Sequence, residues 1–306
     1  MTSPGEPASV SLATPLRLAT RRSAQASTQA TIVAEALATA TGRATELVYV
    51  ETSGDRQQLV PLHSIGGQGV FVKEVQQAVL DGRADLAVHS AKDLPSETAD
   101  GLTIGAFTAR RDPADALVGS RLADLDRGAT VASGSVRRRA QLAAVRPDLR
   151  FVELRGNISR RLEQVPDRGA IVMAVAALDI LGLSDRVDER LDPLRFVPAV
   201  GQGCVAVECR DDDHDAFAAL RAVDDGPTRL AVTVERAFLA ELGSGCSLPV
   251  GAHVANGRLS VFMASIDVAA PAPVTFAEHI DLPDGHDAAV TAARQLAVTA
   301  RHAVGW

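Results

Sequence analysis

The chain has 306 residues, a length that suits two or three domains of roughly 100 residues each. Apolar residues make up 46% of the chain but aromatic residues only 3%, so the core must be built from Ala, Val, Leu and Ile, and few rings are available to stack on bases. The formal net charge is −7, which also argues against a general polyanion binder. We therefore expect no nucleic-acid partner.

Residues 1–14 are rich in Pro, Ser and Thr, without a basic start followed by a long apolar run. We therefore expect a disordered leader, no secretory signal and a cytoplasmic protein. The longest apolar stretch, residues 170–178, is too short to cross a bilayer, so no membrane partner is expected. The three cysteines, Cys204, Cys209 and Cys246, lack zinc-type spacing, so we expect free thiols and no metal site.

The first part of the chain alternates strands and helices. The expected elements are strands at 16–19, 46–50 and 85–88 and helices at 27–41 and 71–80. This β-α-β-α-β order favours a largely parallel sheet, and a strand at 204–209 can return to it. We assign residues 15–110 and 201–226 to this first α/β lobe.

A second series of strands and helices follows. The expected elements are strands at 130–132, 150–154 and 170–173 and helices at 136–145 and 158–165. From about residue 228 the pattern changes to a helix, three alternating strands and a last helix. We assign residues 111–200 to a second α/β lobe and 227–306 to a small domain. The predicted fold class is α/β, with two α/β lobes and a small C-terminal α+β domain.

The most informative stretch is Val88–Pro95, which places a base, a hydroxyl, an ammonium and a carboxylate where an apolar strand ends. These groups belong to His89, Ser90, Lys92 and Asp93, and Lys92 is one of only two lysines among 31 basic residues. Ligands of open α/β sheets bind outside the carboxyl ends of strands. The alternative is a solvated turn with a surface ion pair, and for His89 we favour a buried histidine of the core.

Arginines crowd a predicted helix start. Ser135 is a suitable N-cap, yet Arg137, Arg138 and Arg139 follow in the first turn, where the helix dipole disfavours cations. Each cation costs about 0.3–1 kcal/mol there. We therefore expect an anion to offset these charges, in a cradle that suits carboxylate or phosphate.

Two further strand ends carry the same residue type. Arg155 follows the strand at 150–154, with Arg161 in the next helix, and Arg21 follows the first strand in the opposite lobe. The simplest common explanation is a ligand with several carboxylates held between two lobes. The alternative is that arginine is abundant in this chain and that these are solvated faces.

The thiols divide into two kinds. Cys204 and Cys209 fall on opposite faces of one strand and are expected in the core. Cys246 lies in a glycine-rich loop between a helix and a strand, where exposure would make it reactive. The glycines at 66–69 lack the lysine and hydroxyl of a nucleotide-binding loop, so we interpret them as a flexible loop.

Several segments together resemble the porphobilinogen deaminase family, also called hydroxymethylbilane synthases, and the resemblance runs from about Leu16 to the end. The segments are Leu18–Arg21, Gly69–Glu74, Ala87–Asp93, Leu154–Asn157 and Pro198–Gly203. The resemblance implies two lobes like those of periplasmic binding proteins and a third domain that carries a cysteine. It also implies a cytoplasmic, monomeric transferase of tetrapyrrole (haem) biosynthesis. Its substrate would be porphobilinogen, joined head to tail with release of ammonia into hydroxymethylbilane.

The resemblance also assigns roles to residues. Cys246 matches the thioether attachment site of a dipyrromethane cofactor, the primer of the reaction, and Asp93 matches the catalytic carboxylate. The other positions that match cofactor-binding residues are Lys92, Ser90, Ser133, Ser135, Arg137, Arg138 and Arg155. The positions that match substrate-binding residues are Arg21, Ser23, Phe71, Arg161 and Gln202.

Several positions depart from the family pattern, among them Gln68 and Ile180. Gln68 replaces a lysine of the glycine-rich loop, and Ile180 replaces an arginine associated with cofactor or substrate carboxylates. Loss of one charge-assisted contact weakens binding by about 1.5–3 kcal/mol. These departures motivate an alternative, a degenerate paralogue or two-lobed protein that binds a pyrrole acid without turnover. A phosphate-ligand binder is a third hypothesis, which rests only on the arginine turns.

Overall fold

The computed structural model of the protein describes residues 14–52, 54, 69, 71–243, 248–265 and 274–306. Its helices and strands, in chain order, are β1 (Leu16–Arg21), α1 (Ala24–Thr41), β2 (Thr45–Val50), α3 (Lys73–Leu80), β3 (Leu86–Ser90), the 3₁₀ turn η2 (Ala91–Asp93), β4 (Leu102–Phe107), β5 (Asp115–Val118), β6 (Thr130–Ala132), α4 (Val136–Val145), β7 (Arg150–Val152), α5 (Ile158–Leu162), β8 (Ala170–Ala174), α6 (Val175–Asp179), η3 (Ser184–Arg186), β9 (Glu189–Arg190), β10 (Val205–Arg210), α7 (His214–Leu220), α8 (Gly226–Glu241), β11 (Val250–Ala255), β12 (Arg258–Ala264), β13 (Thr275–Asp281) and α9 (His286–Val304). None of the helices in these ranges is both long and apolar enough to span a membrane.

Lobe 1 is a five-stranded sheet in the order β2-β1-β3-β10-β4, with α1, α3 and α7 around it. β1 runs parallel to β2 and β3, whereas β10 runs antiparallel to both β3 and β4. The expected return of a late strand to this sheet is confirmed, since β10 lies between β3 and β4. The expectation of a largely parallel sheet is confirmed, since β1, β2 and β3 are parallel and β4 points the same way, and of these five strands β10 alone runs in the opposite direction.

Lobe 2 repeats this plan with a second five-stranded sheet, β7-β6-β8-β5-β9, accompanied by α4, α5 and α6. β6 is parallel to β7 and β8, and β5 is antiparallel to β8 and β9. Buried aliphatic residues fill both sides of the sheet, with Ile171 and Met173 on one side and Leu117 and Val172 in a second cluster. Each lobe thus has its own core.

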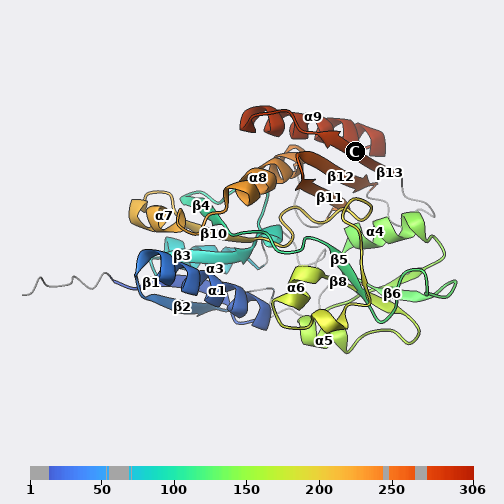
Figure 1. Ribbon diagram of the computed structural model, residues 1–306, viewed down its shortest axis with the longest axis horizontal. Coiled ribbons are helices and arrows are strands. Elements are labelled where there is room, and N and C mark those ends of the chain that lie inside the picture. Colours follow the sequence, from blue (N-terminus) through green and yellow to red (C-terminus); the bar gives the residue numbers. More distant parts are fainter. Residues whose placement is uncertain (1–13, 53, 55–68, 70, 244–247, 266–273) are drawn as a thin grey trace, which may run out of the picture.

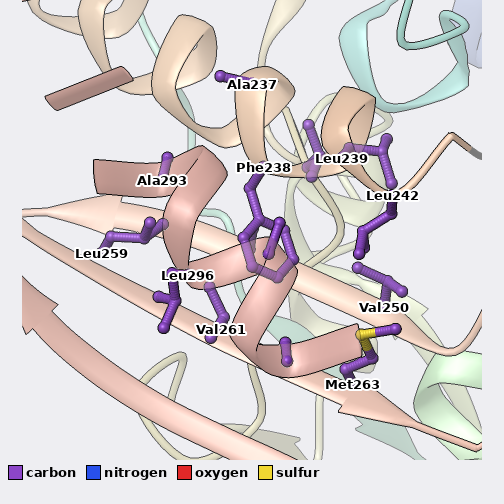
Figure 2. Packing of buried hydrophobic residues seen from close by; sticks show 14 of the residues in the cluster. Ala237, Phe238, Leu239, Leu242, Val250, Leu259, Val261, Met263, Ala293 and Leu296 are labelled. Atoms are coloured by element: carbon purple, nitrogen blue, oxygen red, sulfur yellow. The ribbon is translucent and has the colours of Figure 1, made fainter. Parts of the chain in front are cut away.

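The C-terminal unit packs the sheet β11-β12-β13 against α8 and α9. Figure 2 shows Phe238, which is fully buried, projecting from α8 into a cluster that includes Val261 and Met263 of β12 and Leu296 of α9. Figure 1 shows this unit lying across both lobes, and its α8 contacts β4 while its β12 contacts α4. Two α/β lobes and a small α+β unit are therefore present, and the predicted fold class is confirmed.

Two segments connect the lobes: residues 108–114 form the first crossing and residues 191–204 the second. The fully buried carboxylate of Glu235, on α8, binds both. It accepts hydrogen bonds from both terminal nitrogens of Arg110, at 2.7 Å each, and from the backbone N–H of Gly201 at 2.8 Å. Burial alone would raise the pKa of Glu235, but Arg110 outweighs it and lowers that pKa to about 2. The C-terminal unit is therefore tied to both crossings.

Candidate functional site

Lys92 and Asp93 lie on η2, directly after the buried strand β3. The backbone N–H of Ala91 donates to the carbonyl of Cys204 at 2.9 Å, which fixes the start of the turn on the second crossing. Gly201, with φ of +69°, allows this approach, because a Cβ there would lie 2.9 Å from the Ala91 Cβ. The sequence therefore folds this turn between β3 and the crossing, with both charged side chains partly exposed.

A first cavity, the Asp93 cavity, encloses about 360 Å³ including space open to solvent. Asp93 lines it together with three residues that the sequence predicts for substrate binding: Arg21, Ser23 and Phe71. The Arg21 guanidinium lies over the Phe71 ring, 4.1 Å from its centroid, in a cation–π arrangement. Ser23 also caps α1, since its hydroxyl accepts from the backbone N–H of Ala26 at 3.3 Å.

A second cavity, the interlobe cavity, encloses about 410 Å³ including space open to solvent. Ser90 and Lys92 of lobe 1 line it, opposite alanines of β8 and α6 in lobe 2. Gln25 and Gln29 line both cavities. The Ser90 hydroxyl donates to Gln29 Oε1 at 2.9 Å, and Gln25 Nε2 donates to the Ser90 oxygen at 3.4 Å. Sequence reasoning missed both glutamines, because the predicted helix starts at residue 27; in α1, which starts at Ala24, their spacing of four residues places them on one face.

The arginines at the start of α4 are neutralised inside the protein. Asp115, a buried residue of β5, forms ion pairs at 2.8 Å with both Arg137 and Arg138. Burial alone would raise the pKa of Asp115, but the two guanidiniums outweigh it and hold that pKa well below its usual range. Arg139 pairs with Glu153 at 2.6 Å. The anion that the sequence predicts for this turn is therefore supplied by carboxylates of the protein.

Several of the predicted site residues lie next to this ion-pair cluster. Gln202 is buried, and its amide donates to the Pro113 carbonyl at 2.7 Å and to Asp115 at 2.8 Å. Ser133 is buried and accepts from the backbone N–H of Ser135 at 3.2 Å, and Ser135 caps α4 as predicted. None of the residues in this cluster lines either cavity.

Arg161 brings charge from lobe 2 toward the lobe 1 site. Burial lowers its pKa to about 10, helped by the nearby charges of Arg138, Arg155 and Arg21 and opposed by Asp93. Its Nε donates to the Gly156 carbonyl at 2.7 Å. For Arg155, burial lowers the pKa and Glu153 opposes it. Arg161 of lobe 2 is thus close enough to Arg21 and Asp93 of lobe 1 for their charges to act on it.

Lys92 is the cation closest in sequence to Asp93. Burial and the charges of Arg138 and Arg137 lower its pKa to about 8, against the opposing charges of Asp93 and Asp115. Such a shift is typical of functional sites, although ion-pair networks also produce it. The charge of Lys92 is therefore sensitive to pH at mildly alkaline values.

Three of the remaining residues singled out in the sequence are buried. His89 is buried as predicted, with Nε2 3.1 Å from Glu208, a carboxylate that also accepts from the Gln76 amide. Cys204 and Cys209 are buried free thiols, also as predicted, and burial raises their pKa values to about 12 and 11.

Two predicted positions, Cys246 and Gln68, lie outside the described residues. Ile180 is partly buried and ends α6. Across the ranges that the structure covers, no cluster of His, Cys, Asp or Glu could hold a metal ion.

Two family models match the chain. One is described as "Porphobilinogen deaminase, dipyromethane cofactor binding domain" and matches residues 16–218. The other is described as "Porphobilinogen deaminase, C-terminal domain" and matches residues 229–268.

Curated proteins of the same name are similar over most of their length. The chain is 46% identical over 299 residues to the porphobilinogen deaminase of Thermobifida fusca, covering 93% of this chain and 92% of that protein. It is 43% identical over 248 residues to that of Brevibacillus brevis, covering 79% and 80%. Among solved structures, the methionine binding protein MetQ gives a TM-score of 0.44 at 13% identity, covering 70% of this chain and 91% of that one.

Proposed function

The chain belongs to the porphobilinogen deaminase family, and from this premise we propose that Asp93 is its catalytic carboxylate and Cys246 its primer-bearing residue. The enzyme is a transferase that joins porphobilinogen units head to tail, releases ammonia and forms hydroxymethylbilane for tetrapyrrole biosynthesis. The observation that carries the assignment of Asp93 is the Asp93 cavity, where this carboxylate lies beside a cation, a hydroxyl and an aromatic ring.

The family's dipyrromethane cofactor fits the donor set of the two cavities. Carboxylate side chains on each pyrrole need cations and hydroxyls, and Arg21, Ser23, Ser90 and Lys92 supply both types of group around Asp93. When bound, the cofactor supplies the terminal pyrrole to which the first substrate unit is joined. On lobe 2, Arg155 and Arg161 add cations near the same space.

Asp93 acts on charge that develops in the substrate. Loss of ammonia from porphobilinogen leaves a cationic azafulvene, and its attack by a pyrrole moves positive charge onto that ring. An ionised carboxylate held beside the reacting rings stabilises both species without reorganisation. Arg21, Ser23, Phe71 and Arg161 bind and orient the substrate, because a dicarboxylate needs fixed cations to hold its ring in one pose.

The buried residues of the predicted site fix the positions of the partly exposed ones. Asp115 and Gln202 fix Arg138, whose side chain is 10% exposed, and Arg137 spans from Asp115 to the Val197 carbonyl at 2.7 Å. The residues proposed to bind the cofactor are Ser90, Lys92, Ser133, Ser135, Arg137, Arg138 and Arg155, with Cys246 as the covalent link. Those proposed for the substrate are Arg21, Ser23, Phe71, Arg161 and Gln202.

The proposal includes the assembly of the protein. Residues 15–110 with 201–226, 111–200, and 227–306 form three domains, after a leader of residues 1–14. The enzyme works as a cytoplasmic monomer and takes no nucleic acid, since its acidic net charge of −7 favours neither a polyanion nor an anionic membrane surface.

Intact mass under denaturing conditions tests the cofactor assignment. We expect the purified protein to exceed its sequence mass by one dipyrromethane, and the Cys246→Ser variant to show the unmodified mass. Wild-type protein without the added mass, purified from cells supplied with porphobilinogen, would instead favour a binding protein without turnover.

A further inference from the structure

The interlobe cavity holds a cation that the site described above does not use. Arg111, in the first crossing, lines it together with Lys92, and no Asp or Glu lines it. A cavity with two cations and no acid is suited to an anion.

The two sequence neighbours of Arg111 are neutralised by the protein, whereas Arg111 is not. Arg110 pairs with Glu235 at 2.7 Å, and Asp112 pairs with Arg190. The guanidinium of Arg111 forms no hydrogen bond or ion pair within the ranges that the structure describes. Arg111 is exposed, and no carboxylate of the described residues neutralises its charge.

The backbone of Arg111 is held in place by both crossings. Its N–H donates to the Gly203 carbonyl at 2.8 Å. Gly203 has φ of +84°, and a Cβ there would lie 2.6 Å from the Arg111 carbonyl oxygen. The close approach of the two crossings thus fixes the backbone of Arg111 beside the cavity that this residue lines.

The other walls suit a flat ring that carries carboxylates. Lobe 2 contributes only the small apolar residues Ala174, Ala176 and Ala177, against which a pyrrole can lie. Lobe 1 contributes the amides of Gln25 and Gln29. Since these amides also line the Asp93 cavity, a chain of linked pyrroles can pass from one cavity to the other.

We propose that Arg111 is a further carboxylate-binding residue of the interlobe cavity, where it binds an acetate or propionate side chain of the growing pyrrole chain. The inference rests on the proposed function and adds a binding residue to it. Arg111 and Lys92 bind one unit of the pyrrole chain while Asp93 acts on the next unit. Removing the Arg111 charge should therefore slow one elongation step and leave cofactor loading intact.

The test follows the enzyme-bound chains directly. Wild type, Arg111→Gln, Arg111→Lys and the matched surface control Arg221→Gln are mixed with limiting porphobilinogen and quenched in acid, and the masses of the protein with successive added units are measured. Arg221 is exposed at the end of α7 and lines neither cavity. Melting temperatures verify that the variants fold alike.

We expect Arg111→Gln to carry the cofactor mass but to accumulate one intermediate, with that step slowed roughly tenfold, as loss of one charge-assisted contact implies. Arg111→Lys should restore most of the wild-type distribution because it keeps the charge. Matching distributions in Arg111→Gln and Arg221→Gln would overturn this role of Arg111, and so would a defect that Arg111→Lys does not relieve. Wild type that gains no units at all would instead contradict the proposed function.

Discussion

The two lobes repeat one sheet plan but handle charge in different ways. In lobe 2 the arginines at the start of α4 are fixed by Asp115 and Glu153, with ion pairs of 2.6–2.8 Å. In lobe 1 Arg21 lies over an aromatic ring in an open cavity, beside Asp93. Lobe 2 is thus a prearranged cationic wall, and lobe 1 supplies the carboxylate that we propose acts on the substrate.

This difference shows what a cluster of arginines does in a folded protein. A buried ion pair costs desolvation and is weak evidence for stability, but it fixes the geometry of both partners. Asp115 leaves the cluster of Arg137, Arg138 and itself with one net positive charge and little freedom to move.

The largest effect is expected from the catalytic carboxylate of lobe 1. Asp93→Ala should lower turnover by about 10²- to 10³-fold, the usual cost of removing one preorganised electrostatic group. Steady-state formation of hydroxymethylbilane measures it, with Asp100→Ala as the matched control on an exposed residue of the same lobe. Near-normal turnover in Asp93→Ala would mean that lobe 1 does not supply the reacting charge.

The next effect concerns the fixed wall of lobe 2. Asp115→Ala leaves two buried guanidiniums without their carboxylate, so the free energy of unfolding should fall by about 3–5 kcal/mol. Urea unfolding measures it. The control is Asp281→Ala, which breaks an exposed pair with Arg258 and should cost about 1 kcal/mol or less. Equal losses in the two variants would show that Asp115 does not hold the wall in place.

Much of this organisation is predictable from the sequence. Caps and periodicity gave α4 its bounds, and Gly42 ends α1 in the left-handed conformation as predicted, with φ of +68°. α1 begins earlier than predicted, at Ala24, because Ser23 caps it. The strands β4 and β5 flank the first crossing and escaped prediction, since no local signal says which segment pairs with a strand that returns from the far lobe.

The residues of the candidate site were predictable from the sequence, but the contacts that hold them in place were not. The run from His89 to Asp93 indicates a site because its polar groups follow an apolar strand. That Asp115 neutralises Arg137 and Arg138 depends on the β5–β8 pairing, a contact between distant segments. Periodicity alone carries no information on such a contact. For the same reason the sequence did not show that, among the described residues, Arg110 and Asp112 are paired whereas Arg111 is not.

The smallest effect is a pH dependence that belongs to the contact between the lobes. The pKa of Lys92 is lowered to about 8 from 10.5 by burial and by the arginines of lobe 2. The unfolded chain therefore binds more protons than the folded one between these values. In that window stability should rise with pH, by no more than about 1.4 kcal/mol per unit, while carboxylate binding weakens as Lys92 loses its charge.

As pH rises, stability should increase while carboxylate binding weakens, and this opposition distinguishes Lys92 from another titrating group. Urea unfolding and porphobilinogen binding are measured across pH 8 to 10, the window set by the Lys92 pKa, for wild type, Lys92→Met and Lys92→Arg. Lys92→Met should remove the rise in stability, and Lys92→Arg should keep binding constant through the window because its guanidinium stays protonated. If binding by Lys92→Arg fell with pH as in wild type, the titrating group would lie elsewhere, and the arginines of lobe 2 would not act on lobe 1 through this lysine.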